Sequence, residues 1–425
     1  MFDNKIINFF FNSNFIFKLP KKSQIVFYKK RSYSSLIDSL STKKIQYLDC
    51  LENCQKVYVV LLIKSLLHFV FKNQVKLKLY AGIKIYYYYY YFKITNPNII
   101  ISATENDPLF YFLKKFYPNG NFIVLQNGKK NHHYFINIIE SFKKNNCLDK
   151  PNIDYFFCFG DLLKFKLKNY FSKRVKIISH GSITNNDFKI LRNKKNIKRI
   201  GIISEFVDID PITKLDVFNK PIELLNNTTV SRNDYYLPER ISLPIILKFC
   251  KKNNLKIMII TRSNFNDKNK NSEKFFFKKC LSQIKNIKND NIEFSCDKKL
   301  SIKEKYNLTD KNILNIGFGT SSMDLEILSR GNKFCFLSLR GKIIKKKHNK
   351  DYAYWFWPKK INKKNFLTED SSKEGKILNF LEKMFKIDKK NYINQLNKIK
   401  IDDFIKYNSQ NLILKKSIIN ILNHK

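Results

Sequence analysis

The fold is decided by the stretch Asn312-Ile-Leu-Asn-Ile-Gly-Phe-Gly-Thr-Ser-Ser-Met-Asp-Leu-Glu-Ile-Leu-Ser-Arg-Gly331. Its apolar start, 313–316, predicts a short buried strand, and the glycine- and hydroxyl-rich residues 317–322 predict a turn. Residues 324–330 then predict a helix that ends at Gly331, before a second apolar strand. A strand, a turn and a helix make half of a βαβ unit, and such turns lie at the carboxyl edge of a parallel sheet, where α/β proteins bind ligands.

The composition of this turn suits a phosphorylated ligand. Gly317 and Gly319 allow the backbone to come close to a ligand, and free amides at a helix start suit phosphate oxygens. Glu326 lies one turn inside the predicted helix, where it could accept hydrogen bonds from ribose hydroxyls. The same residues also fit an ordinary βα turn whose serines cap a helix, so the local pattern leaves both interpretations open.

The composition of the chain bounds its class and its partners. Its 425 residues can bury two α/β domains, and the formal net charge is +45. The charge is almost all lysine and is spread through every segment, whereas nucleic-acid proteins concentrate arginine and basic blocks. We therefore expect small anionic ligands or phospholipid headgroups as partners and no nucleic acid.

The cysteines and the apolar runs indicate a cytoplasmic protein without a metal. The eight cysteines include no CxxC pair, and several lie in apolar runs, which suits reduced, buried thiols. No histidine lies near Cys50 and Cys54, so we expect neither a metal site nor a cofactor. The most apolar stretch, 57–71, is interrupted by Lys64 and His68 and is shorter than the ~20 residues of a membrane span.

Alternating strand and helix patterns fill both halves of the chain. Six strands are predicted in the first half, and every polar cluster there follows the carboxyl end of a predicted strand, as expected of a ligand-binding parallel sheet. The tyrosine run 86–91 predicts a helix packed on that sheet, and 205–237 predicts a long loop. The predicted strands are 24–28, 45–48, 99–102, 122–125, 155–159 and 175–179 in the first half, and 199–204, 256–260, 292–295, 313–316 and 334–337 in the second.

The turn also resembles a known family. Ser321-Ser-Met-Asp-Leu-Glu-Ile-Leu-Ser-Arg-Gly331 is similar to the Ser-Thr-Leu-Gly-Tyr-Glu-x-x-x-Arg-Gly run of the bacterial surface carbohydrate (polysaccharide) biosynthesis proteins. Asp324 replaces the family glycine and Leu325 its tyrosine. Glu326 and Gly331 after a hydroxyl-rich turn also resemble the nucleotide-sugar half-site of GT-B glycosyltransferases. Further similar motifs follow in the family's order: Thr104–Tyr111, Gln126–Gly128, Asp154–Gly160, Gly181–Asn186 and Tyr354–Pro358.

The resemblance implies a GT-B-like α/β fold with two Rossmann-like domains that face each other across a cleft. We expect an N-terminal arm at 1–23, an acceptor-side domain at 24–187 and a linker at 188–198. A nucleotide-sugar domain at 199–385 and C-terminal helices at 386–425 would complete the chain.

Two sets of site residues follow from the resemblance. Arg262 would offset the diphosphate charge, and so would Arg330 if it points inward, although Arg330 also fits a helix C-terminus. The predicted nucleotide-sugar residues are Arg262, Gly317, Gly319, Thr320, Ser321, Ser322, Glu326 and Arg330.

In the N-terminal domain the candidate catalytic groups are Glu105, Asp107 and His180, with Glu105 favoured as the base that deprotonates an acceptor. Asp107 also fits a helix N-cap before Pro108. The amide groups would bind sugar hydroxyls, although Asn-Gly is a turn dipeptide by itself. The predicted sugar and acceptor residues are Asn106, Gln126, Asn127, Gly128, Gly181, Ser182, Asn185 and Asn186.

The first functional hypothesis is a cytoplasmic glycosyltransferase of surface polysaccharide biosynthesis, for capsule or lipopolysaccharide. It would move a sugar from a nucleotide-sugar to a glycan or lipid-linked acceptor at the inner membrane face, with weak peripheral attraction to anionic lipid. The alternatives are a sugar-nucleotide 2-epimerase of the same fold and a non-catalytic binding or scaffold member of a polysaccharide assembly complex.

Overall fold

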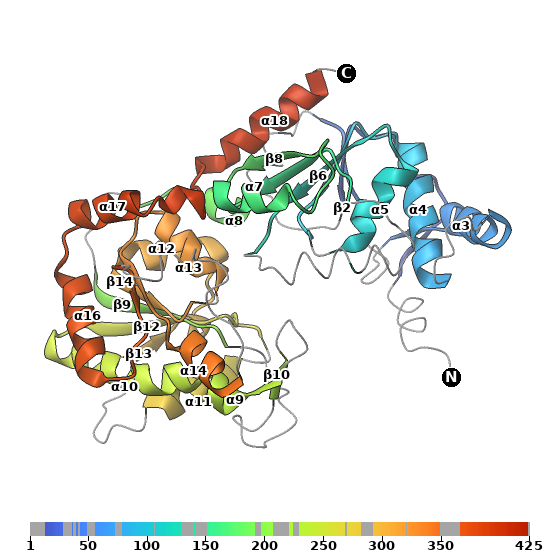
Figure 1. Cartoon of the computed structure of the whole chain (residues 1–425). Coiled ribbons are helices and arrows are strands. Elements are labelled where there is room, and N and C mark those ends of the chain that lie inside the picture. Colours follow the sequence, from blue (N-terminus) through green and yellow to red (C-terminus); the bar gives the residue numbers. More distant parts are fainter. Residues whose placement is uncertain are drawn as a thin grey trace. The chain divides into compact units, whose positions relative to one another are not determined.

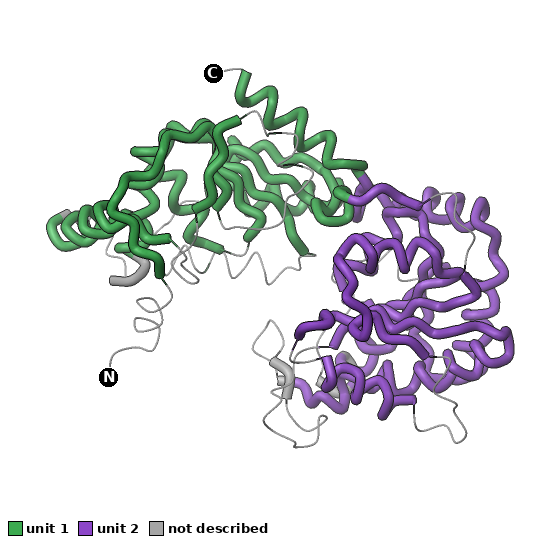
Figure 2. The backbone as a smooth tube through the Cα atoms, turned by 180° about the vertical axis from the view of Figure 1, so that it is seen from behind, with its two compact units in different colours: residues 1–128, 134–187, 408–425 green, residues 129–133, 188–407 purple. Residues whose placement is uncertain are grey.

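The structure is a computed structural model, and its chain forms two compact units (Figure 2). The N-terminal unit comprises 1–128, 134–187 and 408–425, and the C-terminal unit comprises 129–133 and 188–407. The structure describes residues 13–28, 36, 40, 43–48, 56–72, 79–105, 107–128, 140, 151–191, 197–206, 221–223, 229–267, 270–281, 292–319, 321–348 and 366–423.

The N-terminal unit contains a six-stranded parallel sheet in the order β3-β2-β5-β6-β7-β8 (Figure 1). The chain adds β3 on one side of β2 and then builds outward on the other side, so the strand order reverses between β2 and β5. All six strands predicted in this half are confirmed. Their bounds are Ile25–Tyr28 (β2), Ile45–Leu48 (β3), Ile99–Ser102 (β5), Asn121–Leu125 (β6), Tyr155–Cys158 (β7) and Lys176–Ser179 (β8).

Helices cover both faces of this sheet because its strands are apolar on both sides. Val26 and Tyr28 belong to the core under α3, α4, α5 and α7, whereas Ile25 and Phe27 belong to the core on the opposite face. The predicted tyrosine helix is confirmed, and four of its six tyrosines are buried. The helices of this unit are Val59–Lys72 (α3), Leu79–Thr95 (α4), Pro108–Phe116 (α5), Asp161–Leu167 (α7), Ile183–Asn186 (α8) and Leu412–Asn423 (α18).

The last helix of the chain belongs to the N-terminal unit. Leu414, Ile418 and Ile421 of α18 are buried in the same apolar cluster as Ile99 and Ile101 of β5. The chain therefore returns to its first sheet after completing the second unit.

The C-terminal unit contains a second six-stranded parallel sheet, in the order β13-β12-β9-β14-β15-β16. Counted along the chain this is the order 3-2-1-4-5-6 of dinucleotide-binding folds, with its reversal between β9 and β14. Both units are thus Rossmann-like. The strands are Ile197–Ile203 (β9), Lys256–Ile260 (β12), Ile292–Phe294 (β13), Asn312–Gly317 (β14), Phe334–Leu337 (β15) and Thr368–Glu369 (β16).

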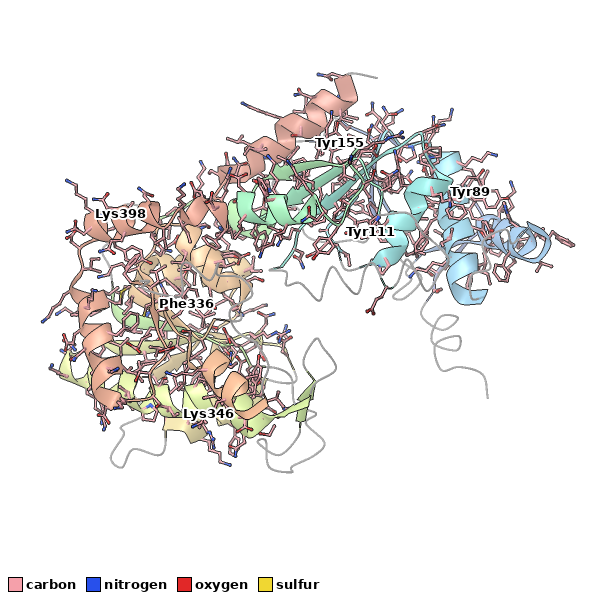
Figure 3. All side chains as sticks on the ribbon, in the orientation of Figure 1. Tyr89, Tyr111, Tyr155, Phe336, Lys346 and Lys398 are labelled. Carbon is pink, nitrogen blue, oxygen red and sulfur yellow. The ribbon has the colours of Figure 1, made fainter. Side chains whose placement is uncertain are left out.

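The helices of the C-terminal unit complete its layers. Figure 3 shows the labelled Phe336 of β15 inside this unit, whereas Lys346 and Lys398 point outward. The helices are Arg232–Tyr235 (α9), Leu237–Lys252 (α10), Lys270–Leu281 (α11), Ile302–Lys311 (α12), Ser322–Ser329 (α13), Leu339–His348 (α14), Glu374–Lys386 (α16) and Lys389–Lys398 (α17).

The predicted long loop at 205–237 is wrong in its second part. There the chain forms an antiparallel hairpin of β10 (Pro221–Glu223) and β11 (Thr229–Ser231), followed by α9. The Ser231 side chain accepts a hydrogen bond from the Asp234 amide and so starts that helix. Elements of three or four residues are too short to show a hydrophobic period, which explains why the pattern missed them.

The five cysteines that the structure describes are buried and form no disulfide, as predicted for reduced thiols. Burial raises the pKa of Cys250 and of Cys280 to about 12, which makes both thiols unreactive.

Gly201 of the central strand β9 should not tolerate a side chain. A Cβ there would overlap Asn312 Nδ2 and Asn315 Oδ1, which are hydrogen-bonded to each other over 2.8 Å. Because this buried pair cannot move without losing its bond, we expect Gly201→Ala to lower the free energy of unfolding by about 1–3 kcal/mol. Urea denaturation would measure this.

Gly375 provides the control for that experiment. It lies in the first turn of α16, and a Cβ there would meet no atom within 4 Å. Gly375→Ala should leave the free energy of unfolding unchanged or raise it by up to about 1 kcal/mol. Equal effects of the two substitutions would contradict the packing described for Gly201.

Candidate functional site

A pocket of about 710 Å³ lies at the carboxyl edge of the C-terminal sheet. Its walls are formed by the ends of β9 and β12, by Tyr235 of α9, and by the helices α12 and α13 with the residues before them. Because the strand order reverses between β9 and β14, the pocket lies where open α/β sheets bind ligands. Its polar lining residues are Ser204, Glu205, Tyr235, Thr261, Arg262, Asn264, Lys305, Tyr306, Ser321, Ser322 and Glu326.

The turn after β14 is held by its own side chains. Ser321 caps α13 by accepting a hydrogen bond from the Met323 amide, and Asp324 Oδ2 accepts one from the Ser321 amide in return. Asp324 and Phe334 also fill the space where a Cβ of Gly317 would lie. Gly319 has φ +100° and open space beside it, so it provides the left-handed backbone of the turn.

The prediction of free amides at this helix start is wrong for Ser321 and Met323. The Ser321 amide also donates to Glu205 Oε1 over 3.0 Å, and the Met323 amide donates to the Ser321 hydroxyl that caps the helix. The physical reason is the two carboxylates that face the helix start, one from Glu205 at the end of β9 and one from Asp324. A phosphate here would have to be compensated mainly by cationic side chains.

Two cations lie on the pocket wall. Lys305 Nζ donates to the carbonyl oxygens of Thr261 and Ser263 over 2.9 and 3.3 Å, and burial lowers the pKa of this lysine. Arg262 is exposed, and its backbone amide is fixed by a hydrogen bond of 2.9 Å to Glu273 Oε1. The sequence predicted Arg262 but missed Lys305, because nothing distinguishes this lysine among the 80 Lys and Arg of the chain.

Glu326 is oriented by a neighbouring helix. Its Oε2 accepts a hydrogen bond of 2.6 Å from the Tyr306 hydroxyl of α12, and only 5% of the residue is exposed. Burial raises the pKa of Tyr306 well above its usual value, so the phenol keeps its proton and remains the donor. The structure therefore brings together four of the predicted nucleotide-sugar residues: Arg262, Ser321, Ser322 and Glu326.

Arg330 lies outside the pocket lining. It follows α13 as the C-cap, and its guanidinium forms a fully buried ion pair with Asp310, with N–O distances of 2.5 and 2.8 Å. It also donates to the carbonyl oxygens of Phe188 and Lys189. The structure places Arg330 at the helix C-terminus, which is one of its two interpretations. These bonds do not indicate a contact with a diphosphate.

A second buried charge cluster supports the pocket wall. Arg340 of α14 forms ion pairs with Glu205 and Glu239, and its Nε donates to the Tyr235 carbonyl oxygen over 2.8 Å. Glu205 and Tyr235 line the pocket, so Arg340 fixes two of its walls from behind. This cluster could not be predicted from the sequence, because Arg340 lies more than 100 residues from Glu205, Tyr235 and Glu239 and no motif relates it to them.

The buried cluster should make stability depend on pH. Burial is the main reason that the pKa of Glu239 is raised to about 7, well above the usual range of a glutamate. The folded state therefore keeps a proton that the unfolded state loses between about pH 4.5 and 7, and this group's contribution to stability falls as the pH rises through that window.

Glu239→Gln removes this titration. Between pH 5 and pH 7.5 the wild-type protein should lose the stability that this proton contributes, whereas the variant should not. The free energy of unfolding of the variant minus that of the wild-type protein should therefore rise over this range and stay constant above it. Urea denaturation across that range would measure it, and a difference that does not change with pH would contradict the assignment.

In the N-terminal unit the structure brings Glu105 and the Gln126–Gly128 turn together. Glu105 is buried, and its Oε1 accepts hydrogen bonds from the amides of Asn127 and Gly128 over 2.9 and 3.2 Å. Gln126 accepts from the Phe159 amide and donates to the Gly128 carbonyl oxygen. These side chains join the loops that follow β5, β6 and β7, while the Asn127 side chain is exposed.

The other two catalytic candidates have different surroundings. Asp107 caps α5, as its alternative interpretation predicted, and accepts hydrogen bonds from the Leu109 amide and the Tyr28 hydroxyl. His180 is fully buried, and burial lowers its pKa to about 4. Among the described residues its ring nitrogens have no hydrogen-bond partner.

The loop after β8 is tied to the end of the chain. Gly181 has φ +93°, and Ser182 caps the short helix α8 by accepting from the Asn185 amide. Asn186 donates to the His180 carbonyl oxygen and accepts from the amide of Asn408. Asn185 is also fully buried.

Two predicted site residues, Asn106 and Thr320, and the aromatic block at 354–358 lie outside the described residues. Within the described part of the chain, no group of three or more His, Cys, Asp or Glu side chains could hold a metal ion. No helix there is both long enough and apolar enough to cross a bilayer.

Comparison with known families identifies the class of this protein. Residues 123–423 match a family described as "putative O-antigen biosynthesis protein". Because the match covers more than half of the chain, the chain belongs to this family of O-antigen biosynthesis proteins. No curated protein matches it.

Several solved structures are similar over most of their length. One is S. aureus MnaA with UDP, at 11% identity and a TM-score of 0.48, covering 95% of this chain and 97% of that one. Another is the Methanocaldococcus jannaschii UDP-GlcNAc 2-epimerase with UDP-GlcNAc and UDP, at 10% identity and 0.48, covering 94% and 99%. A third is Acinetobacter baumannii MurG, at 7% identity and 0.43, covering 96% and 100%.

Proposed function

We propose that this protein is a GT-B-type glycosyltransferase of O-antigen or related surface polysaccharide biosynthesis. It would bind a nucleotide-sugar in the pocket of the C-terminal unit and pass the sugar to a glycan or lipid-linked acceptor. The observation that carries the proposal is the pocket itself, which lies at the strand-order reversal and combines the cations Arg262 and Lys305 with the oriented carboxylate of Glu326. Its volume of about 710 Å³ suits a ligand of this size.

Each lining group has a role in the proposed complex. Lys305 and Arg262 would offset the charge of the diphosphate, which is also the leaving group, and the hydroxyls of Ser321 and Ser322 would donate to its oxygens. Glu326 would accept hydrogen bonds from the ribose hydroxyls. No metal enters this proposal. The acceptor and the base are assigned to the carboxyl edge of the N-terminal sheet, where Glu105 and Asp107 are the candidates.

A non-catalytic binding role is the second candidate, and a specific observation favours it. The Glu105 carboxylate holds two backbone amides and Asp107 caps a helix, so both candidate bases already have a structural task. A 2-epimerase would use the same pocket. The product distinguishes the three: free nucleoside diphosphate with an acceptor for the transferase, an epimerised nucleotide-sugar without one for the epimerase, and unchanged nucleotide-sugar for the scaffold.

Binding is tested first, by thermal unfolding with a panel of nucleotide-sugars. A ligand that binds only the folded state at about 100 times its dissociation constant stabilises it by about 2.7 kcal/mol, which raises the melting temperature. Glu326→Gln should weaken binding of that ligand by about tenfold or more, because a charged hydrogen-bond acceptor is lost. Glu374→Gln changes an exposed glutamate of the same unit and should bind as the wild-type protein does.

The proposal fails if no nucleotide-sugar raises the melting temperature of the wild-type protein. It also fails if Glu326→Gln and Glu374→Gln bind the ligand equally well. We also propose that the reaction takes place in the cytoplasm, with peripheral contact at the inner membrane face.

A further inference from the structure

Helix α3 of the N-terminal unit exposes a continuous apolar stripe. Five of its side chains, spaced i, i+3, i+4, i+7 and i+8, point to solvent from one helix face. They are Ile63, Leu66, Leu67, Val70 and Phe71, with 51, 40, 53, 70 and 78% of their surface exposed. Single exposed apolar residues are common, but a contiguous stripe of this kind marks an interaction surface.

The opposite face of α3 anchors the helix to its unit. Leu61 and Ser65 are fully buried, and the His68 ring stacks on Tyr86 with ring centroids 4.1 Å apart. His68 Nδ1 also forms a hydrogen bond of 2.9 Å with the Tyr90 hydroxyl of α4. Figure 1 shows α3 beside α4, at the outer edge of the N-terminal unit. The outward direction of the stripe is therefore fixed by packing on its other side.

The N-terminal arm supplies further exposed apolar groups next to α3. Strand β1 (Phe15–Ile16) pairs with β4 (Val57–Tyr58), the two residues that directly precede the helix. Phe17 and Leu19, which follow β1, are 77 and 51% exposed.

The sequence around the stripe is strongly basic. Residues 53–104 contain seven lysines and no aspartate or glutamate. Lys64 is exposed within α3, Lys56 is exposed just before it, and Lys18 is exposed between Phe17 and Leu19 of the arm. The partner must therefore offer an apolar layer together with negative charge.

We infer that α3 is an in-plane docking surface for a bilayer that contains anionic lipid. Such a bilayer offers acyl chains to the stripe and negative headgroups to the lysines. A second copy of this chain fits less well, because a two-fold interface would place the same basic surfaces against each other. The helix has 14 residues, fewer than the ~20 of a membrane span, so it would lie in the interface.

This inference names the surface for the membrane contact in the proposed function, but it does not depend on sugar transfer. The test is co-flotation of the full chain with vesicles of phosphatidylcholine, with and without phosphatidylglycerol. We expect the wild-type protein to float with the anionic vesicles, and the double substitution Leu67→Ser, Phe71→Ser to lower its partition coefficient by about tenfold or more. Lys64→Glu and added salt should also lower it.

Phe165→Ser is the matched control, because Phe165 of α7 is 75% exposed in the same unit but lies on another helix. This variant should bind the anionic vesicles as the wild-type protein does. All these side chains are exposed, and unchanged thermal unfolding would show that the variants fold.

Three results would overturn the inference. The first is a wild-type protein that does not float with anionic vesicles, and the second is a double variant that floats as well as the wild-type protein. The third is a wild-type oligomer in solution that the double variant breaks, since this would assign the stripe to a second copy. The nucleotide-sugar thermal shift of the same double variant tests the proposed function separately, and it should be unchanged.

Discussion

Replacing Arg340 by methionine is expected to lower the free energy of unfolding by about 3–5 kcal/mol, as breaking a buried ion pair does. The Arg340 side chain has no exposed surface, and it is the shared cationic partner of Glu205 and Glu239. Without it, the Glu205 and Glu239 carboxylates would remain buried and would lose the cation that they share. Urea or guanidinium denaturation would measure the loss, which should shrink at pH 5 because a carboxyl can then take up a proton.

Two controls make this result specific. Arg174 is exposed, and Arg174→Met should change the free energy of unfolding by less than about 0.5 kcal/mol. Adding Glu205→Gln to Arg340→Met should recover part of the stability, because one of the unpaired charges is removed. If Arg340→Met were as stable as Arg174→Met, the result would contradict the buried ion pairs described for Arg340, Glu205 and Glu239.

Arg330→Met is expected to destabilise the C-terminal unit by a similar amount, about 3–5 kcal/mol. The substitution leaves Asp310 buried with no cationic partner in the described part of the chain, and it removes two bonds to the backbone of residues 188 and 189. Asp310 keeps hydrogen bonds from the Asn332 side chain and the Leu191 amide, but these donors are neutral. Denaturation curves of the variant would show the loss.

The double variant Arg330→Met, Asp310→Asn should be more stable than Arg330→Met alone, since the uncompensated carboxylate is gone. The single variant also decides between the two interpretations of Arg330. If Arg330→Met had wild-type stability but bound nucleotide-sugar more weakly, the result would support the diphosphate role that the sequence suggested.

The sequence predicted the strands of both sheets well, for a physical reason. Parallel strands covered on both faces are continuous apolar runs, and runs such as 99–102, 256–260 and 334–337 end at polar residues that mark the carboxyl edge. The doubly wound architecture follows from the alternation of such runs with helical patterns. Two-residue strands such as β16 carry no such signal.

Long-range pairings could not be predicted in the same way. The apolar face of α18 shows that the helix is packed, but not that it covers the first sheet rather than the second. Arg340 reaches partners at positions 205 and 239, and no local spacing relates these three residues. The tertiary fold decides which charged side chains are buried, and local sequence motifs carry no information about these long-range contacts.

The candidate site was predicted in part. Glu326, Ser321, Ser322 and Arg262 do meet in one pocket. Arg262 closely follows β12, and the other three lie in the turn and helix that follow β14 of the same sheet. The amides at the start of α13 differ from the prediction because the Ser321 amide donates to Glu205 and Asp324, and the Met323 amide donates to the Ser321 hydroxyl. Asp324 occupies the position where the resembling family has glycine. This departure was the signal in the sequence that the Ser321 amide would be occupied by a side chain.

Photoaffinity labelling tests the central claim most directly. A nucleotide-sugar with an azide on its base would be cross-linked to the wild-type protein, and the labelled peptides would be identified by mass spectrometry. We expect labels in peptides that contain the pocket segments 261–264, 300–306 or 321–326, and we expect unmodified nucleotide-sugar to prevent them. Labels confined to the N-terminal unit, or labelling that unmodified ligand does not reduce, would contradict the account.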